Sequence, residues 1–111
     1  MKTQFRVELG VVLKQIREER RYKLRTLGAL ANVTYGYISE IENGKKEPSS
    51  EMVAVLAEAL GMKVSEILRR VADRVEFYEK IESVGDTIPS WVEASVRPYI
   101  PLKRVPTNGY K

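Results

Sequence analysis

Residues 23–48 constrain the fold most, because they encode two short helices joined by a turn of only two residues. Leucine and alanine recur at helical spacing from Leu24 to Ala31, which predicts one amphipathic helix. In the turn, Asn32 tolerates the left-handed conformation that ends a helix, and Val33 fills the angle between the helices. Thr34 is expected to cap the next helix, since its hydroxyl accepts a hydrogen bond from an unpaired backbone N–H. The segment therefore predicts two helices held at a fixed angle.

The second of these helices, which starts after Thr34, has a small apolar inner face and a polar outer face. Ile38 and Ile41 are three residues apart and are expected to be buried, and Gly44 is expected to stop the helix in a left-handed conformation. The side chains expected to be exposed are Tyr35, Tyr37, Ser39, Glu40 and Asn43. Short or planar hydrogen-bonding groups of this kind suit a helix that reads base edges in the major groove of DNA.

Periodic apolar positions predict three further helices around this pair. The first runs from about Val7 to Arg20 and is expected to expose Glu8. Another runs from Ser50 to Leu60, with Ser49 as its cap. A fifth helix begins near Val64 and is long. The predicted fold class is therefore all-α, with five helices, a long fifth helix and an irregular, proline-containing C-terminal tail.

The fifth helix divides the predicted domains, which are a DNA-reading domain at residues 1–70 and an extension with a tail at residues 71–111. The start of this helix, from Val64 to Leu68, is expected to close the core of the first domain. Its later part forms an apolar ridge that needs a partner, and a second copy of the chain is the simplest one. The alternative is that the chain's own tail covers the ridge. The residues expected at a dimer interface are Val71, Val75, Tyr78, Ile81 and Trp91.

The residue types that the chain lacks exclude several kinds of chemistry. It has no cysteine and no histidine, which excludes disulfides, Cys/His zinc sites and histidine-based acid–base catalysis. No glycine-rich phosphate loop is present either, so an enzyme is not expected and no metal or cofactor is implied. No apolar run is long enough to span a membrane, and the N-terminus lacks an apolar signal core. A cytoplasmic protein with no membrane partner is expected.

The positive charge is concentrated near the two-helix segment. The chain has a formal net charge of +4. Residues 1–49 hold ten lysines and arginines against six glutamates, whereas residues 50–84 hold five against seven acidic residues. A surface that meets phosphate is expected to carry such an excess, although an ordinary soluble protein could show it as well.

The pattern as a whole resembles the Cro/C1-type (XRE) family of helix-turn-helix DNA-binding proteins over residues 8–70. The resemblance rests on Leu27 to Thr34, Gly36 to Gly44, Pro48-Ser49 and Leu56 to Gly61. Residues 36–51 look particularly like the actinobacterial Clp-gene regulators, which are dimeric activators of protease and chaperone genes. The resemblance implies a prokaryotic or phage regulator of transcription with a lambda-repressor-like domain.

Two sets of side chains are predicted to meet double-stranded DNA. The residues predicted to contact bases are Tyr35, Gly36, Tyr37, Ser39 and Glu40. The residues predicted to contact phosphates are Lys23, Arg25, Thr34, Asn43, Lys45 and Lys46. The alternatives are structural: tyrosines that pack between helices, a salt partner for Glu40 within its own helix, a hydroxyl that only caps, and lysines that are merely solvated.

Three positions have expected roles in the framework. Glu42 should face inward, and the resemblance implies an ion pair with Arg17, because family members often pair this glutamate with an arginine of the first helix. Gly28 stands where the family usually has alanine and lowers helix propensity by about 1 kcal/mol. Close packing against another helix is the expected compensation for this glycine. Lys23 stands where a capping Ser, Thr or Asn is common, so it leaves its helix without that cap.

Two functions of different classes follow from these features. The first is a dimeric, sequence-specific regulator of transcription that binds a pseudo-palindromic operator with half-sites one helical turn apart. The second is an antitoxin-type protein that neutralises a co-encoded partner and regulates its own operon, with residues 85–111 as the partner-binding arm. An activator would also contact RNA polymerase, although no motif in the chain marks such a surface.

Overall fold

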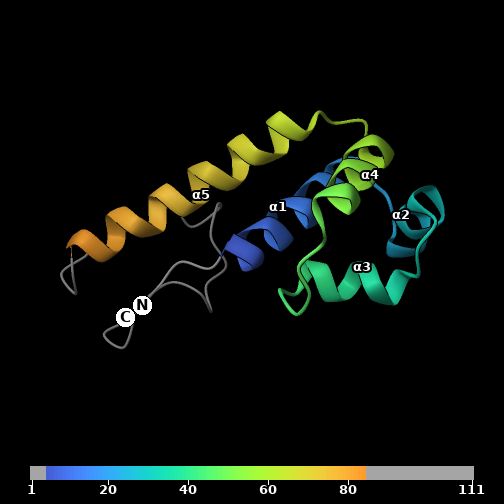
Figure 1. The fold of residues 1–111 in the computed structure, drawn as a ribbon, viewed down its shortest axis with the longest axis horizontal. Coiled ribbons are helices and arrows are strands. Elements are labelled where there is room, and N and C mark those ends of the chain that lie inside the picture. The colour runs from blue at the N-terminus through green and yellow to red at the C-terminus, as the bar shows by residue number, and fades with distance from the viewer. Residues whose placement is uncertain (1–4, 85–111) are drawn as a thin grey trace. The chain divides into compact units, whose positions relative to one another are not determined.

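A computed structural model describes residues 5–84 and contains five helices, with no strand in that range (Figure 1). The helices are α1 (Phe5–Glu19), α2 (Leu24–Ala31), α3 (Tyr35–Glu42), α4 (Ser50–Leu60) and α5 (Val64–Val84). The predicted all-α fold is therefore confirmed. The bounds of α2 and α4 are as predicted, whereas α1 begins and ends earlier than predicted. The predicted C-terminal tail, including Trp91, lies outside the described residues.

Capping residues set the starts of α3 and α4. The Thr34 hydroxyl accepts a hydrogen bond from the Tyr37 amide at 3.1 Å, and the Ser49 hydroxyl accepts one from the Met52 amide at 3.1 Å. Each bond satisfies one of the N–H groups that the start of a helix leaves without a partner. The turn before Thr34 is also as predicted, because Asn32 ends α2 in the left-handed conformation with φ 60°.

The connection from α1 to α2 turns sharply at Arg21. This residue adopts φ 60°, in the left-handed region that glycine usually occupies. Its N–H donates to the Glu18 carbonyl oxygen, and the Tyr22 N–H donates to the Arg17 carbonyl oxygen, both at 3.0 Å. These are the two bonds of a Schellman motif, which gives the Arg17 and Glu18 carbonyl groups partners although a residue with a Cβ occupies the left-handed position.

All five helices contribute to one hydrophobic core, which lies within the compact unit that ends at Val75. The part of α5 from Glu76 onward belongs to a second unit. The buried residues of the core are Leu9, Val12, Leu13, Ile16, Leu27, Ala31, Ile38, Ile41, Leu56, Ala57, Leu60, Ile67 and Val71.

The apolar side chains in the first part of helix α5 are not all buried. Ile67 and Val71 enter the core, whereas Val64 and Leu68 are 37% and 44% exposed. The segment from Val64 to Leu68 therefore does contribute to the core, as expected, but through Ile67, whereas Val64 and Leu68 themselves are exposed. Val71 also packs in the core of the first domain, so it does not lie on an exposed ridge.

Three other residues expected at a dimer interface lie within the described range, and none of them is freely exposed. Tyr78 and Ile81 are buried within the single chain, and Val75 is half-buried. Among residues 64–82 of α5, the large apolar side chains that are exposed are Val64 and Leu68, in its first two turns.

A buried ion pair joins α1 to α5. Arg74 Nε donates to Glu8 Oε1 at 2.7 Å, and the Glu8 side chain is 0% exposed. The expectation that Glu8 faces solvent is therefore wrong. A charge on the core side of a helix is stable only with a partner, and this partner lies 66 residues away, where no local pattern reveals it.

Two glycines let backbone segments approach closely. A Cβ on Gly10 of α1 would lie 2.3 Å from the Ile41 carbonyl oxygen of α3, so α1 crosses α3 at a point where only glycine fits. A Cβ on Gly28 would lie 2.8 Å from the Val33 carbonyl oxygen. The close packing expected at Gly28 is therefore present, but it is made with the turn rather than with another helix.

Candidate nucleic-acid interface

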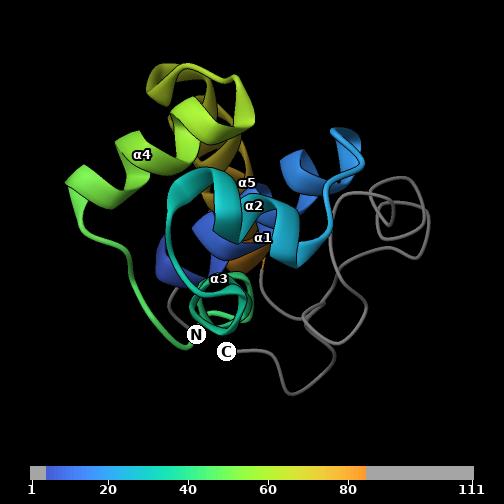
Figure 2. The same cartoon turned by 90° about the vertical axis from the view of Figure 1, so that its right-hand side faces the viewer.

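Helix α3 is held by the rest of the domain from one side. It packs against α1 and α2, and α2 packs in turn against α4. Figure 2 looks nearly along α3 and shows α1 and α2 on the same side of it. Ile38 and Ile41 are buried, as predicted. The packing leaves the opposite side of the helix available for a ligand.

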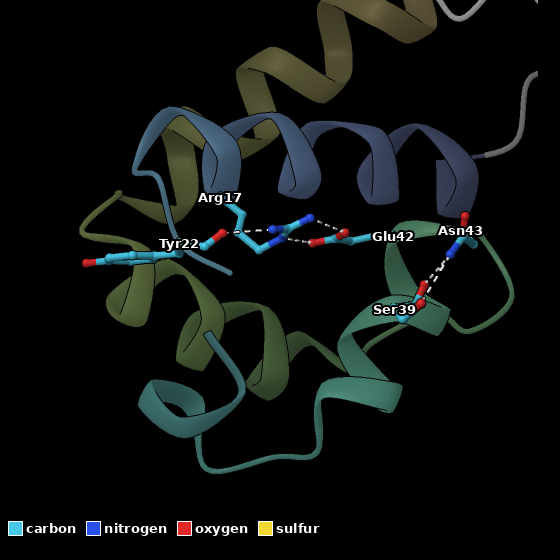
Figure 3. Close-up of polar contacts among 5 residues, drawn as sticks. All are labelled: Arg17, Tyr22, Ser39, Glu42 and Asn43. Atoms are coloured by element: carbon cyan, nitrogen blue, oxygen red, sulfur yellow. Dashed lines mark hydrogen bonds and ion pairs between the residues drawn. The ribbon is translucent and has the colours of Figure 1, made fainter. Parts of the chain in front are cut away.

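An ion pair joins α1 to α3 at the two residues that the family resemblance implies (Figure 3). Arg17 Nε donates to Glu42 Oε2 at 2.6 Å, and Arg17 Nη2 donates to Glu42 Oε1 at 3.0 Å. Arg17 Nη1 also donates to the Tyr22 carbonyl oxygen at 2.8 Å. The guanidinium of this α1 residue therefore binds both α3 and the segment that connects α1 to α2. The hydrogen bond to Glu42 raises the pKa of Arg17 above its ordinary value, and its charge therefore persists at any pH that the fold survives.

The residues predicted to contact bases differ in exposure. Tyr35 is 52% exposed, Glu40 is exposed, and no atom lies within 4 Å of a Cβ placed on Gly36. Tyr37 and Ser39 are half-buried, and Tyr37 packs against the core. The start of α3 is thus the most open part of the helix, and Tyr37 and Ser39 are only partly exposed, less than expected.

Arg25 and Tyr35 form a contact between α2 and α3 on the exposed side. The guanidinium carbon of Arg25 lies 5.0 Å from the centroid of the Tyr35 ring, which is cation–π geometry. The sequence predicts a phosphate contact for Arg25 and a base contact for Tyr35, without relating the two residues. The structure brings them together as one unit at the start of α3.

A second group of polar contacts lies at the end of α3. Lys46 Nζ is 3.7 Å from Glu40 Oε1 and 6.0 Å from the centroid of the Tyr37 ring. Glu40 therefore has a salt partner, as the structural alternative proposed, but this partner lies in the loop after α3 rather than in the same helix. Asn43 Nδ2 donates to the Ser39 carbonyl oxygen at 2.8 Å and to Ser39 Oγ at 3.3 Å (Figure 3).

The residues predicted to contact phosphates are all exposed and flank α3 in the sequence. Lys23 occupies the N-cap position before α2 and makes no side-chain cap hydrogen bond, as predicted. The Thr34 hydroxyl is used as a cap. The exposed residues are Lys23, Arg25, Thr34, Asn43, Lys45 and Lys46.

Arg20 has a structural role that no local pattern indicates. Its Nε donates to the Leu60 carbonyl oxygen at 2.7 Å, and its Nη2 donates to the Gly61 carbonyl oxygen at 3.3 Å. The side chain thus completes the end of α4, where carbonyl groups lack partners. Arg20 belongs to a basic run in the sequence, and only the fold separates its role from that of the neighbouring cations.

Other kinds of site are not found in the described part of the chain. Residues 5–84 contain no cluster of histidine, cysteine, aspartate or glutamate arranged to hold a metal ion. In the same range, no helix combines the length and the apolar character that crossing a membrane requires.

Comparison with known proteins identifies the family. A family model described as helix-turn-helix matches residues 13–67, which include α2, α3 and α4. The transcriptional regulator ClgR of Mycobacterium tuberculosis is 32% identical over 101 residues, covering 85% of this chain and 90% of ClgR. The chain belongs to the Cro/C1-type (XRE) helix-turn-helix family.

Solved structures of helix-turn-helix proteins share its fold. The clp gene regulator ClgR from Corynebacterium glutamicum superposes with a TM-score of 0.71 at 32% identity, covering 86% of this chain and 97% of that chain. The restriction-modification controller protein C.AhdI from Aeromonas hydrophila superposes with a TM-score of 0.54 at 26% identity, covering 55% of this chain and 92% of that chain. The resemblance to Clp-gene regulators thus extends well beyond residues 36–51.

Proposed function

We propose that this chain is a dimeric, sequence-specific regulator of transcription that inserts α3 into the major groove of DNA. The observation that carries the proposal is the one-sided support of α3. Ile38, Ile41 and Glu42 hold it from within, while Tyr35 and Glu40 are exposed on its other faces. The major groove admits an α-helix, and each base pair presents a distinct pattern of donors, acceptors and methyl groups there.

Cations around α3 support the same proposal. Lys23 and Arg25 stand at the start of α2, and Lys45 and Lys46 follow the end of α3, all four exposed. Contacts from such residues to phosphates orient a protein on the duplex and supply affinity that depends on salt. The proposed division of labour is that these cations position the domain, and the exposed face of α3 selects the sequence.

A second copy of the chain is part of the proposal, because a helix of 8 residues meets few base pairs. A dimer places two such helices about 34 Å apart, in successive turns of the major groove. The surface proposed for the second copy is α5, where Val64 and Leu68 are exposed and Val75 is half-buried. Trp91, which lies outside the described residues, remains a proposed contributor.

The relatives suggest where such a regulator acts. Two of them carry the name ClgR, and the Corynebacterium glutamicum protein is described as a clp gene regulator. We therefore propose clp-type genes as targets, and the cytoplasm, where bacterial DNA lies, as the site of action.

Selection of bound sites from random-sequence duplexes tests this function, with the mass of the complex measured by light scattering. The expected result is an inverted repeat with its two halves about one helical turn apart and two chains per duplex. Failure to enrich any sequence, even at low salt, would contradict the proposal. Co-purification of a different small protein in place of the second copy would favour the antitoxin-type function instead.

A further inference from the structure

Glu40 and Lys46 form a pair on the face of α3 proposed to meet DNA. Their charged atoms are 3.7 Å apart, and their side chains are 47% and 55% exposed. The loop that carries Lys46 is anchored to the same residue, because the Lys45 and Lys46 amides both donate to the Glu40 carbonyl oxygen, at 2.8 and 3.3 Å. Lys46 is therefore held next to Glu40 by its backbone as well as by its charge.

A carboxylate on this face presents a physical problem for DNA binding. An unpaired Glu40 carboxylate would be repelled by phosphates as the protein approaches DNA, and the positive charge of Lys46 beside it offsets part of that repulsion. A pair this exposed is weak, because water screens it and two long side chains lose freedom to form it. It can therefore open at little cost when either member finds a better partner.

DNA offers a better partner to each member. Glutamate accepts a hydrogen bond from the N4 amine of cytosine in the major groove. Guanine and thymine present acceptors or a methyl group there, and adenine places its N7 acceptor beside its N6 amine, which disfavours a carboxylate. The lysine ammonium can form an ion pair with a phosphate of the DNA backbone. Where thymine replaces that cytosine, Glu40 faces an acceptor in place of the amine and keeps Lys46.

We infer that Glu40 and Lys46 exchange partners on DNA, with Glu40 moving to a cytosine and Lys46 to a phosphate, and that this exchange selects a C·G base pair in each half-site. The inference rests on the proposed function. In this exchange, Lys46 contributes to DNA affinity only when Glu40 is hydrogen-bonded to cytosine. Base choice and phosphate contact are thus coupled through one ion pair.

The dependence of affinity on salt distinguishes this exchange from two independent contacts. The probes are the duplex selected by the wild-type chain and the same duplex with the relevant C·G pair changed to T·A. The slope of log affinity against log salt should be steeper on the C·G duplex by about 0.9, the value for one additional phosphate contact. Lys46→Ala should give equal slopes on the two duplexes, because this variant has no lysine that could move from Glu40 to a phosphate.

Lys45→Ala is the matched control, because Lys45 is exposed in the same loop and its ammonium makes no ion pair within residues 5–84. It should weaken binding to both duplexes and keep the difference between their slopes. Glu40→Gln should lose the preference for cytosine by about tenfold and gain one for adenine, whose N6 and N7 groups suit glutamine. Melting temperatures of all three variants verify that they remain folded.

Two results would overturn the inference while leaving DNA binding intact. One is equal salt slopes for the wild-type chain on the two duplexes, and the other is an unchanged base preference in Glu40→Gln. Absence of binding to any duplex would instead contradict the proposed function, so the two failures are distinguishable.

Discussion

Arg17 and Glu42, 25 residues apart, hold α1 and α3 together through two hydrogen bonds of 2.6 and 3.0 Å between buried, oppositely charged groups. The pair lies on the inner side of α3, away from the exposed face that begins at Tyr35. Its role is therefore to fix the position of the helix rather than to contact DNA.

Replacing Glu42 with alanine should lower the free energy of unfolding by about 3–5 kcal/mol, because the Arg17 charge would remain buried without its partner. Urea unfolding followed by circular dichroism measures this change. Arg70→Ala is the control, since it breaks the exposed Arg70–Glu19 pair and should cost at most about 1 kcal/mol. An unchanged melting temperature together with lost DNA binding would refute the structural role of Glu42.

Gly10→Ala should destabilise the domain by about 1–3 kcal/mol, because its Cβ would overlap the Ile41 carbonyl oxygen and force α1 and α3 apart. Alanine ordinarily stabilises the interior of a helix by about 0.5–1 kcal/mol relative to glycine. A net loss of stability would therefore show that the overlap between the Cβ and the Ile41 carbonyl oxygen outweighs the gain in helix propensity.

Gly36→Ala provides the comparison for Gly10, because no atom lies within 4 Å of its Cβ position. This variant should gain about 0.5–1 kcal/mol from helix propensity. Chemical denaturation of the two proteins side by side should thus give changes of opposite sign. A stabilised Gly10→Ala protein would show that the crossing of α1 and α3 is looser than described.

Arg21→Gly should stabilise the domain by about 1 kcal/mol, since it relieves a side chain held at φ 60° without removing a backbone hydrogen bond. Thermal unfolding measures the gain. Asn32→Gly is the control at the other left-handed position, where a smaller change is expected because asparagine enters this region readily. Equal melting temperatures for wild type and Arg21→Gly would mean that the turn is not strained.

The local features of the fold could be predicted because their causes are adjacent in the sequence. Thr34 and Ser49 each cap the helix that begins at the next residue, and Asn32 ends α2 by its own backbone preference. The Arg17–Glu42 pair spans 25 residues, and it was predictable only through the resemblance to a family.

Features that depend on how helices cross could not be predicted from one sequence. Glu8 is buried because Arg74 of α5 reaches it, and Gly10 matters because the α3 backbone passes within 2.3 Å of its Cβ position. Likewise, Val64 and Leu68 fit an apolar seam as well as Ile67 does, and only the rotation of α5 decides which side chains enter the core. In the site, a spacing pattern does not place Lys46 beside Glu40, because the path of the loop sets that distance.

Methylation interference on the selected duplex tests most directly whether α3 reads the major groove. Methyl groups on guanine N7 project into the major groove, whereas methyl groups on adenine N3 project into the minor groove. Guanine N7 methylation is expected to block binding at two clusters of positions about one helical turn apart, and adenine N3 methylation within those clusters to leave binding intact. Interference from adenine N3 alone, or from neither modification, would contradict the account.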